Sequence, residues 1–404
     1  MNKEIQERIN AVQSGSIPNG YCEGIVGILP NYWTSKPLSE ISEVISEQVG
    51  DNDYETLSIS AGIGFVNQAQ KFGKELSGKQ YKKYTVLRKG DFAYNKGNSK
   101  LYPQGCTYRL KERDEAAVPN VFECFRITEG CPEYYEQLFI SGFMNRQLTR
   151  KINHGVRDDG LLNLTDDDFY STVLPVPPLA EQQKIAKILS ACDSVIKLKQ
   201  ELIAENRKVF LHSMALIFGC SDEYTTLGKI AEITMGQSPD SSSYNTGEDG
   251  VPLLQGNADI ANGLPLPRYY TNSPTKMCSP GEILLSVRAP VGEVSKTHIS
   301  ACIGRGLCSI NAGKLTEYVF YYLKYYGSNW NRISQGSTFT AISGDDIKKI
   351  QIPVADEKML LHQIEVLSCA DTKIHLLEQE LEAWQQKKKV LMQLLLTGLV
   401  RTND

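Results

Sequence analysis

The sequence lacks the features that mark several large classes of protein. No apolar run in its 404 residues approaches the ~18 uninterrupted positions of a membrane-spanning helix. The polar start, MNKEIQERIN, has no signal-peptide core. The ten cysteines include no CxxC pair and the five histidines no HxxxH or HxE pair, so local spacing predicts no metal site. We therefore expect a cytoplasmic chain with free thiols.

Complete catalytic motifs are missing as well. GKELSGKQ at residues 73–80 is close to a phosphate-binding loop, but Gln80 replaces the Ser or Thr that would hold magnesium. VPPL at residues 176–179 has the prolines of an adenine-methyltransferase loop without its flanking polar and aromatic residues. We expect a non-catalytic chain with no cofactor or metal of its own. The alternative is a DNA methyltransferase or nuclease whose active site is assembled from scattered residues.

What the chain does contain is an internal repeat. LSACDSVI at residues 189–196 returns as LSCADTKI at residues 367–374. Upstream, Asp168 matches Asp346 within similar segments. Repetition at this distance predicts two similar units, each of about 190 residues. The two units match in the segments at their ends, which we call the frame, and differ in the interior between those segments.

The interiors read as β-rich. Short β-branched and aromatic runs alternate with turn residues, as in KYTVLRKGDFAYN at residues 83–95 and GEILLSVRAPVGEVS at residues 281–295. Shorter helices are expected at residues 133–152 and 316–333.

Each repeat opens a long amphipathic stretch with a period of seven. Such a narrow apolar seam is typical of a coiled coil, whereas a helix that covers a sheet has a broader stripe. Gly219 and Gly398 are expected to end the two helices. We favour antiparallel pairing of the helices over the alternative that each covers its own β-rich domain. The expected helix-pairing residues are Ile188, Val195, Leu202, Val209 and Leu216 in the first helix, and Leu367, Ile374, Leu377, Leu381, Trp384, Leu391 and Leu395 in the second.

The predicted fold is therefore α+β with a pseudo-two-fold internal repeat. Two β-rich globular domains, at residues 1–178 and 220–354, are joined by two long antiparallel coiled-coil helices, at residues 179–219 and 355–400.

Charge is distributed unevenly. The formal net charge of −4 gives no global signal for nucleic acid, yet residues 71–113 hold twelve Lys and Arg against three acidic residues. Cations bind phosphates, and interleaved Asn, Gln and Arg can read base edges. We favour DNA binding over a solvated lysine-rich surface. The expected contacts are Lys82, Lys83, Arg88, Tyr94, Asn95, Lys96, Asn98, Lys100 and Arg109.

The second interior is less basic, with five cations against two acidic residues at positions 264–306. Taken singly, each polar candidate here is more often structural or solvent-facing than base-reading. Together they fit a groove that faces DNA. The candidates are Gln237, Tyr244, Gln255, Asn257, Arg268, Tyr269, Arg288 and Arg305.

With this layout, the sequence resembles the specificity subunit of type I restriction-modification systems. The resemblance covers almost the whole chain. LPVPPLAEQQKIAKILSACDSVI and QIPVADEKMLLHQIEVLSCADTKI look like the frames of that family. MGQSPDSSSYN, PGEILLSVRAPVGEV and ACIGRGLCSI look like one type of its target-recognition domain. The second frame departs in having ADEK where the first has PPLAEQQ.

The resemblance implies a chain without catalytic activity that binds double-stranded DNA with a bipartite target, each recognition domain reading one half. It implies two modification (methyltransferase) subunits, which carry S-adenosylmethionine and methylate adenine. It also implies restriction/translocase subunits, which use ATP and Mg. A scaffold that reads no bases would instead bind every duplex equally.

Overall fold

The structure, a computed structural model, describes residues 3–73, 78–97, 102–152, 161–219, 221, 223–261, 263–327, 330, 341–354 and 356–402. The chain forms two compact units. Unit 1 comprises Met1–Leu198 and Leu381–Asp404, and unit 2 comprises Lys199–Glu380. Two long helices, α7 (Leu179–Phe218) and α12 (Glu357–Leu396), each contribute one segment to each unit.

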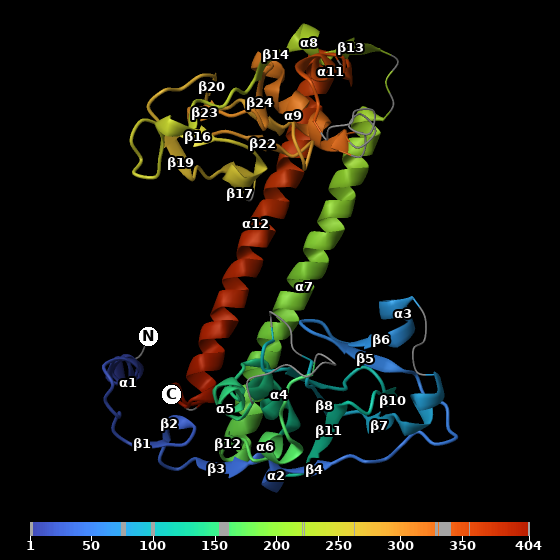
Figure 1. Cartoon of the computed structure of the whole chain (residues 1–404), viewed down its shortest axis with the longest axis vertical. Helices are drawn as coiled ribbons and strands as arrows, with labels where there is room; N and C mark the ends of the chain where they lie inside the picture. Colours follow the sequence, from blue (N-terminus) through green and yellow to red (C-terminus); the bar gives the residue numbers. More distant parts are fainter. Residues whose placement is uncertain are drawn as a thin grey trace. The chain divides into compact units, whose positions relative to one another are not determined.

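Unit 1 is organised around an antiparallel four-stranded sheet in the order β4-β11-β8-β9. Helix α4 (Pro132–Ile140), the first turns of α7 and the last turns of α12 lie beside it (Figure 1). Leu138 of α4, Leu189 of α7 and Leu395 of α12 share one apolar cluster with Phe125 of the sheet. The sheet strands are β4 (Ser42–Val44), β8 (Phe92–Asn95), β9 (Cys106–Arg109) and β11 (Phe122–Ile127).

Smaller elements complete unit 1. Strand pairs β1-β2, β5-β6, β3-β12 and β7-β10 are all antiparallel. Their bounds are β1 (Tyr21–Gly24), β2 (Gly27–Pro30), β3 (Thr34–Pro37), β5 (Leu57–Ser60), β6 (Gly64–Asn67), β7 (Thr85–Arg88), β10 (Glu115–Val118) and β12 (Val173–Val176). The short helices are α2 (Leu38–Ile41), α3 (Gln68–Phe72), the 3-10 helix η1 (Gly78–Lys83), α5 (Asn145–Lys151) and α6 (Asp166–Tyr170).

The helix expected at residues 133–152 is broken in two. α4 ends at Ile140 and α5 begins at Asn145. Gly142 lies between them with φ of +74°, a left-handed conformation that a continuing α-helix cannot contain.

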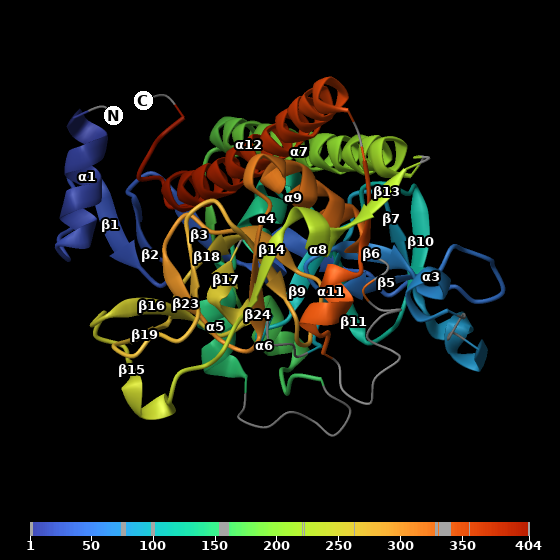
Figure 2. The same ribbon diagram turned by 90° about the horizontal axis from the view of Figure 1, so that it is seen from above.

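The N-terminal helix closes unit 1 against its C-terminal residues. In both views α1 (Lys3–Gln13) lies beside the C-terminal end of the chain (Figures 1 and 2). Arg8 Nη1 donates to the Leu399 carbonyl at 3.0 Å, and the Tyr21 hydroxyl donates to the Gly398 carbonyl at 2.5 Å.

Unit 2 has a four-stranded sheet in the order β14-β24-β21-β22 and a five-stranded sheet in the order β15-β19-β16-β23-β20. Phe218 of α7 packs edge-on against Tyr318 of α9 (Thr316–Tyr325), with ring centroids 5.3 Å apart. The strands are β13 (Tyr224–Thr226), β14 (Glu232–Met235), β15 (Tyr244–Asn245), β16 (Val251–Leu254), β17 (Ile260–Ala261), β18 (Leu264–Pro265), β19 (Tyr269–Thr271), β20 (Met277–Cys278), β21 (Ile283–Ser286), β22 (Val294–Lys296), β23 (Ala301–Ile303), β24 (Leu307–Asn311) and β25 (Gln351–Pro353). The remaining helices are α8 (Leu227–Ile230), η2 (Ser241–Ser243), η3 (Asn257–Asp259), η4 (Gly313–Leu315) and α11 (Gly344–Lys348).

The two units repeat the same frame. The order β4-β11-β8-β9 corresponds to β14-β24-β21-β22, and the pair β3-β12 corresponds to β13-β25. Even a helix cap recurs, because Thr165 Oγ1 accepts from the Asp168 amide and Ser343 Oγ accepts from the Asp346 amide. The five-stranded sheet belongs to unit 2, and the β7-β10 and β5-β6 pairs belong to unit 1. The predicted fold class and duplication are therefore confirmed, with different interiors inside matching frames.

The long helices pair antiparallel within each unit. In unit 1, Lys388 of α12 lies 2.6 Å from Asp193 of α7. In unit 2, Lys199 of α7 lies 2.6 Å from Glu380 of α12. As the position in α7 increases, its partner position in α12 decreases, which is the antiparallel arrangement. No helix within the described ranges has the length and apolar character needed to cross a membrane.

The seam in α12 follows the predicted positions. Leu367, Ile374 and Leu395 are buried. The other predicted positions in this helix are half-buried, namely Leu377, Leu381, Trp384 and Leu391.

Four of the five predicted pairing residues of α7 are wrong by one position. Leu189, Ile203 and Phe210 are buried, and Val195 is half-buried beside Ile196. Each heptad offers two adjacent apolar residues, and the period of seven alone does not decide which of them faces the partner helix. The predicted residues that instead point to solvent are Ile188, Leu202, Val209 and Leu216, which are 39%, 45%, 56% and 65% exposed.

We predict that Leu189→Ala and Ile188→Ala, which each delete three carbon atoms at neighbouring positions, have very different effects on the free energy of unfolding. Leu189 is fully buried, so its truncation should lower the free energy of unfolding by about 2–5 kcal/mol. Truncation of exposed Ile188 should cost less than about 1 kcal/mol. Urea unfolding of the full chain, followed by circular dichroism, measures both. Equal losses would contradict this seam.

Candidate nucleic-acid interface

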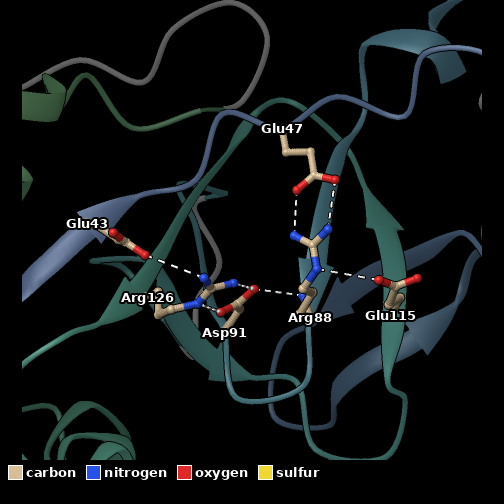
Figure 3. Close-up of polar contacts among 6 residues, drawn as sticks. All are labelled: Glu43, Glu47, Arg88, Asp91, Glu115 and Arg126. Atoms are coloured by element: carbon tan, nitrogen blue, oxygen red, sulfur yellow. Dashed lines mark hydrogen bonds and ion pairs between the residues drawn. The ribbon is translucent and has the colours of Figure 1, made fainter.

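Arg88, a predicted DNA contact, is occupied by carboxylates of unit 1. Figure 3 shows its guanidinium facing Glu47 through two bonds, Nη1 to Oε2 at 2.5 Å and Nη2 to Oε1 at 2.9 Å. Nε lies 3.4 Å from Glu115, which stands directly opposite Arg88 in the β7-β10 pair. The Arg88 guanidinium holds the pKa of Glu47 below its ordinary value, and Glu47 raises the pKa of Arg88.

A second ion pair in the same network is built on the turn between β7 and β8. The Asp91 carboxylate is 1% exposed and accepts from Arg126 Nε at 2.7 Å and Nη2 at 3.0 Å (Figure 3). It also accepts from the Arg88 backbone amide at 2.7 Å. Arg126 reaches Glu43, its partner across β4-β11, at 3.4 Å. The network therefore ties four strands together and presents more carboxylates than guanidinium groups.

Two further cations of the basic segment are structural. Lys96 Nζ lies 2.7 Å from both Glu123 and Asp166. Burial raises the pKa of Glu123, whereas the bond from Lys96 lowers the pKa of Asp166. Arg109 forms ion pairs with Glu133 at 2.5 Å and with Glu136 at 2.9 Å, both on α4. Both cationic side chains are only 13% exposed.

Tyr94 and Asn95 serve the interior of unit 1. Tyr94 is 1% exposed, stacks on Phe169 at 4.3 Å, and donates to the Gln104 carbonyl at 2.7 Å. Asn95 Oδ1 accepts from the Gly97 amide at 2.8 Å. The prediction of Tyr94, Lys96 and Arg109 as DNA contacts is therefore corrected, because all three serve the interior of unit 1, whereas Arg88, whose side chain is 43% exposed, stays a prediction. Counting charges along the sequence does not reveal the carboxylates that pair with these cations, because those carboxylates lie tens of residues away.

Two exposed cations of the segment, Lys82 and Lys83, lie in η1. Lys82 forms an open ion pair with Asp51 at 2.5 Å. Lys83 is exposed and has no charged partner among the residues that the structure describes. Asn98 and Lys100 lie outside the described residues.

In unit 2 the predicted residues converge from four segments of the chain. Gln255 Nε2 donates to the Tyr244 hydroxyl at 2.6 Å, and Gln255 Oε1 accepts from Ser238 Oγ at 2.8 Å. Ser238 Oγ in turn accepts from the Arg305 amide at 3.2 Å. We call this group, with its neighbours, the Gln255 cluster. Its members are Gln237, Ser238, Tyr244, Gln255, Asn257, Asp259, Arg268, Tyr269 and Arg305.

Buried Asp259 anchors the other side of this cluster. Its carboxylate accepts a hydrogen bond from the backbone amide of Gln255 at 2.7 Å and another from Arg268 Nε at 2.6 Å. Asn257 begins the same short helix, η3, and is half-buried. Tyr269 is 40% exposed and lies 6.2 Å from Tyr244 between ring centroids. The Gln255 side chain donates once through Nε2 and accepts once through Oε1 within the cluster, so it positions its neighbours.

Seven of the eight residues predicted in unit 2 thus lie together. Arg288 is exposed but lies in a different place, where its backbone bridges to Ala341. Sequence reasoning missed Ser238 and Asp259, because a single Ser or Asp in a loop carries no distinctive local signal. The cluster exposes Gln237, Arg268, Tyr269 and Arg305, and such amide and guanidinium groups can contact phosphates and base edges.

The duplicated arrangement is shared with a known protein family. The family described as Type I restriction modification DNA specificity domain matches residues 30–205 and 223–382, once in each repeat. The chain belongs to this family. Its specificity domains occur twice, as the duplicated frame requires, and the sequence resemblance is confirmed.

Relatives of this specificity subunit agree. It is 34% identical over 294 residues to the putative type I restriction enzyme MjaX specificity subunit of Methanocaldococcus jannaschii, covering 66% of this chain and 68% of that protein. Its structure is similar to that of the type I restriction-modification S subunit from M. genitalium, with a TM-score of 0.61 and 14% sequence identity. The match covers 91% of this chain and 97% of that subunit. It is also similar to a chain from a structural study of complex assembly and conformational transition in a type I restriction-modification system. That comparison has a TM-score of 0.58 and 22% sequence identity, and it covers 92% of this chain and 99% of the other. These matches do not favour the methyltransferase or nuclease alternative.

The Asp91 network generates a stability prediction for the specificity subunit. Asp91→Asn removes the charge that faces Arg126 in a buried site, and we expect the free energy of unfolding to fall by about 2–4 kcal/mol. The matched control is Glu43→Gln, which alters an exposed partner of the same Arg126 and should have little effect. Thermal and urea unfolding measure both variants. A loss from Glu43→Gln as large as that from Asp91→Asn would contradict the assignment.

Proposed function

We propose that this specificity subunit recognises a bipartite target in double-stranded DNA, with each unit reading one part. The observation that carries the proposal is the repeated frame with unlike interiors. Two copies of one catalyst would share their interiors, whereas two readers of different half-sites need different ones. The Gln255 cluster supplies the candidate reading surface of unit 2.

The chain itself is proposed to be non-catalytic and cytoplasmic. It would dock two modification (methyltransferase) subunits, which bind S-adenosylmethionine and methylate adenine, and restriction/translocase subunits, which use ATP and Mg. The target adenine has to leave the base stack before it is methylated, and that step belongs to the modification subunits.

The proposed DNA contacts are those predicted residues that keep exposed polar groups. In unit 1 these are Lys82 and Lys83. In unit 2 they are Gln237, Arg268, Tyr269, Arg288 and Arg305.

The length of the paired helices is proposed to set the spacer between the half-sites. Support comes from continuity, since α7 and α12 are uninterrupted helices of 40 residues that both belong to both units. A helix resists changes in length, because each residue contributes about 1.5 Å of rise.

The function is tested by an adenine-methylation map of strains with and without this gene, both carrying the modification subunit. We expect deletion to remove methylation at one bipartite motif and to leave other motifs unchanged. Restoring the gene should restore that motif, which is the control. Persistence of every motif after deletion would refute DNA recognition by this chain. Turnover of labelled S-adenosylmethionine by the purified chain alone would refute the non-catalytic role.

The spacer proposal is tested by adding one heptad to each helix, after Leu198 in α7 and after Glu380 in α12. Seven residues add about 10 Å, and base pairs are stacked about 3.4 Å apart, so the methylated motif should gain up to about three spacer base pairs. Both half-sites should stay the same. A heptad-length substitution without insertion controls for sequence change. Methylation with the parental spacer would refute this role of the helices.

A further inference from the structure

Arg305 lies on a turn whose backbone amides all donate hydrogen bonds to segments of the Gln255 cluster. The turn, residues 304–306, joins β23 to β24. The Gly304 amide donates to the Leu254 carbonyl at 2.8 Å, and the Gly306 amide donates to the Gln255 carbonyl at 3.1 Å. The Arg305 amide donates to Ser238 Oγ at 3.2 Å. All three successive amides of the turn are thus held by two neighbouring segments.

The two glycines of this turn are required by close approach. A Cβ at Gly304 would lie 2.3 Å from Gln255 Oε1, and a Cβ at Gly306 would lie 2.4 Å from the Gln255 carbonyl oxygen. The turn therefore packs directly on Gln255, and Arg305 is the one residue of it that carries a side chain.

The Arg305 side chain is exposed and uncommitted. Within the described part of the chain it has no ion pair and no side-chain hydrogen bond. Arg268, in contrast, is held by buried Asp259 at 2.6 Å. Solubility alone does not require a guanidinium on so constrained a turn, because an exposed lysine on any loop provides the same charge.

Guanidinium geometry identifies the ligand chemistry. Its donors form a planar fork that matches two acceptors side by side, and in the major groove guanine presents O6 and N7 in this way. A phosphate also accepts this fork, but it carries no sequence information. Recognition of a base edge needs the accuracy that a fixed turn provides.

We propose that Arg305 reads a guanine in the half-site recognised by unit 2. This inference rests on the proposed function and deepens it, because it names one base and the side chain that selects it. Neighbouring Gln237, whose amide donates to the Ile303 carbonyl at 2.9 Å, lies on the segment that holds the same turn.

The test uses the specificity subunit assembled with its modification subunits and duplexes that carry the methylated motif. Each guanine of both half-sites is replaced singly by 7-deazaguanine, which keeps its pairing but lacks N7. The wild-type complex should bind one substituted duplex at least about fivefold more weakly. Arg305→Gln should lose that sensitivity, and its remaining preference should shift toward adenine, which Gln contacts through N6 and N7.

The matched control is Lys314→Gln, which removes an exposed positive charge elsewhere in unit 2 and should keep the full 7-deazaguanine response. The inference is overturned when Arg305→Gln retains the wild-type response at every guanine, or weakens target and scrambled duplexes by one common factor, as a phosphate contact would. A wild-type complex that does not distinguish target from scrambled DNA refutes the proposed function itself.

Discussion

The antiparallel pairing of α7 and α12 is the constraint on which the rest of the structure depends. Neither unit has a complete core without both helices. Leu189 and Leu395 lie in one cluster of unit 1, and Phe210 and Leu367 lie in one cluster of unit 2. Residues from the two halves of the sequence must therefore meet before either unit is finished, and this couples the folding of the two halves of the chain.

Two lysines at the seam give this pairing its register. Lys388 is 11% exposed and pairs with Asp193, whose other oxygen accepts from Gln137 at 2.9 Å. Lys199 is 19% exposed and pairs with Glu380. An apolar seam with a period of seven tolerates slippage by whole heptads, whereas a half-buried lysine that slipped would lose its carboxylate. The two pairs lie near the middle of α7, one in each unit.

The sequence predicted the frame well and the charged site poorly, for different physical reasons. A repeat such as LSACDSVI reports on a helix directly, because helical contacts recur at short, fixed spacings. The choice of Leu189 over Ile188 depends on a helix almost two hundred residues away. Lys96 and Arg109 failed for the same reason, since the carboxylates that they meet are brought to them by the fold and not by sequence proximity. Gln255 and Arg305 meet because they follow β16 and β23, which pair side by side in the five-stranded sheet.

The paired cations of unit 1 change how DNA affinity has to be explained. Affinity for duplex DNA grows with the number of phosphates that free cations neutralise. Arg88, Lys96 and Arg109 already neutralise carboxylates, so moving them onto phosphates would leave those acids unpaired, some of them buried. On the proposed function, a chain of net charge −4 therefore contributes selectivity through a few fixed side chains. Most of the phosphate binding then falls to the subunits that it positions, which explains why recognition and catalysis can reside in separate chains.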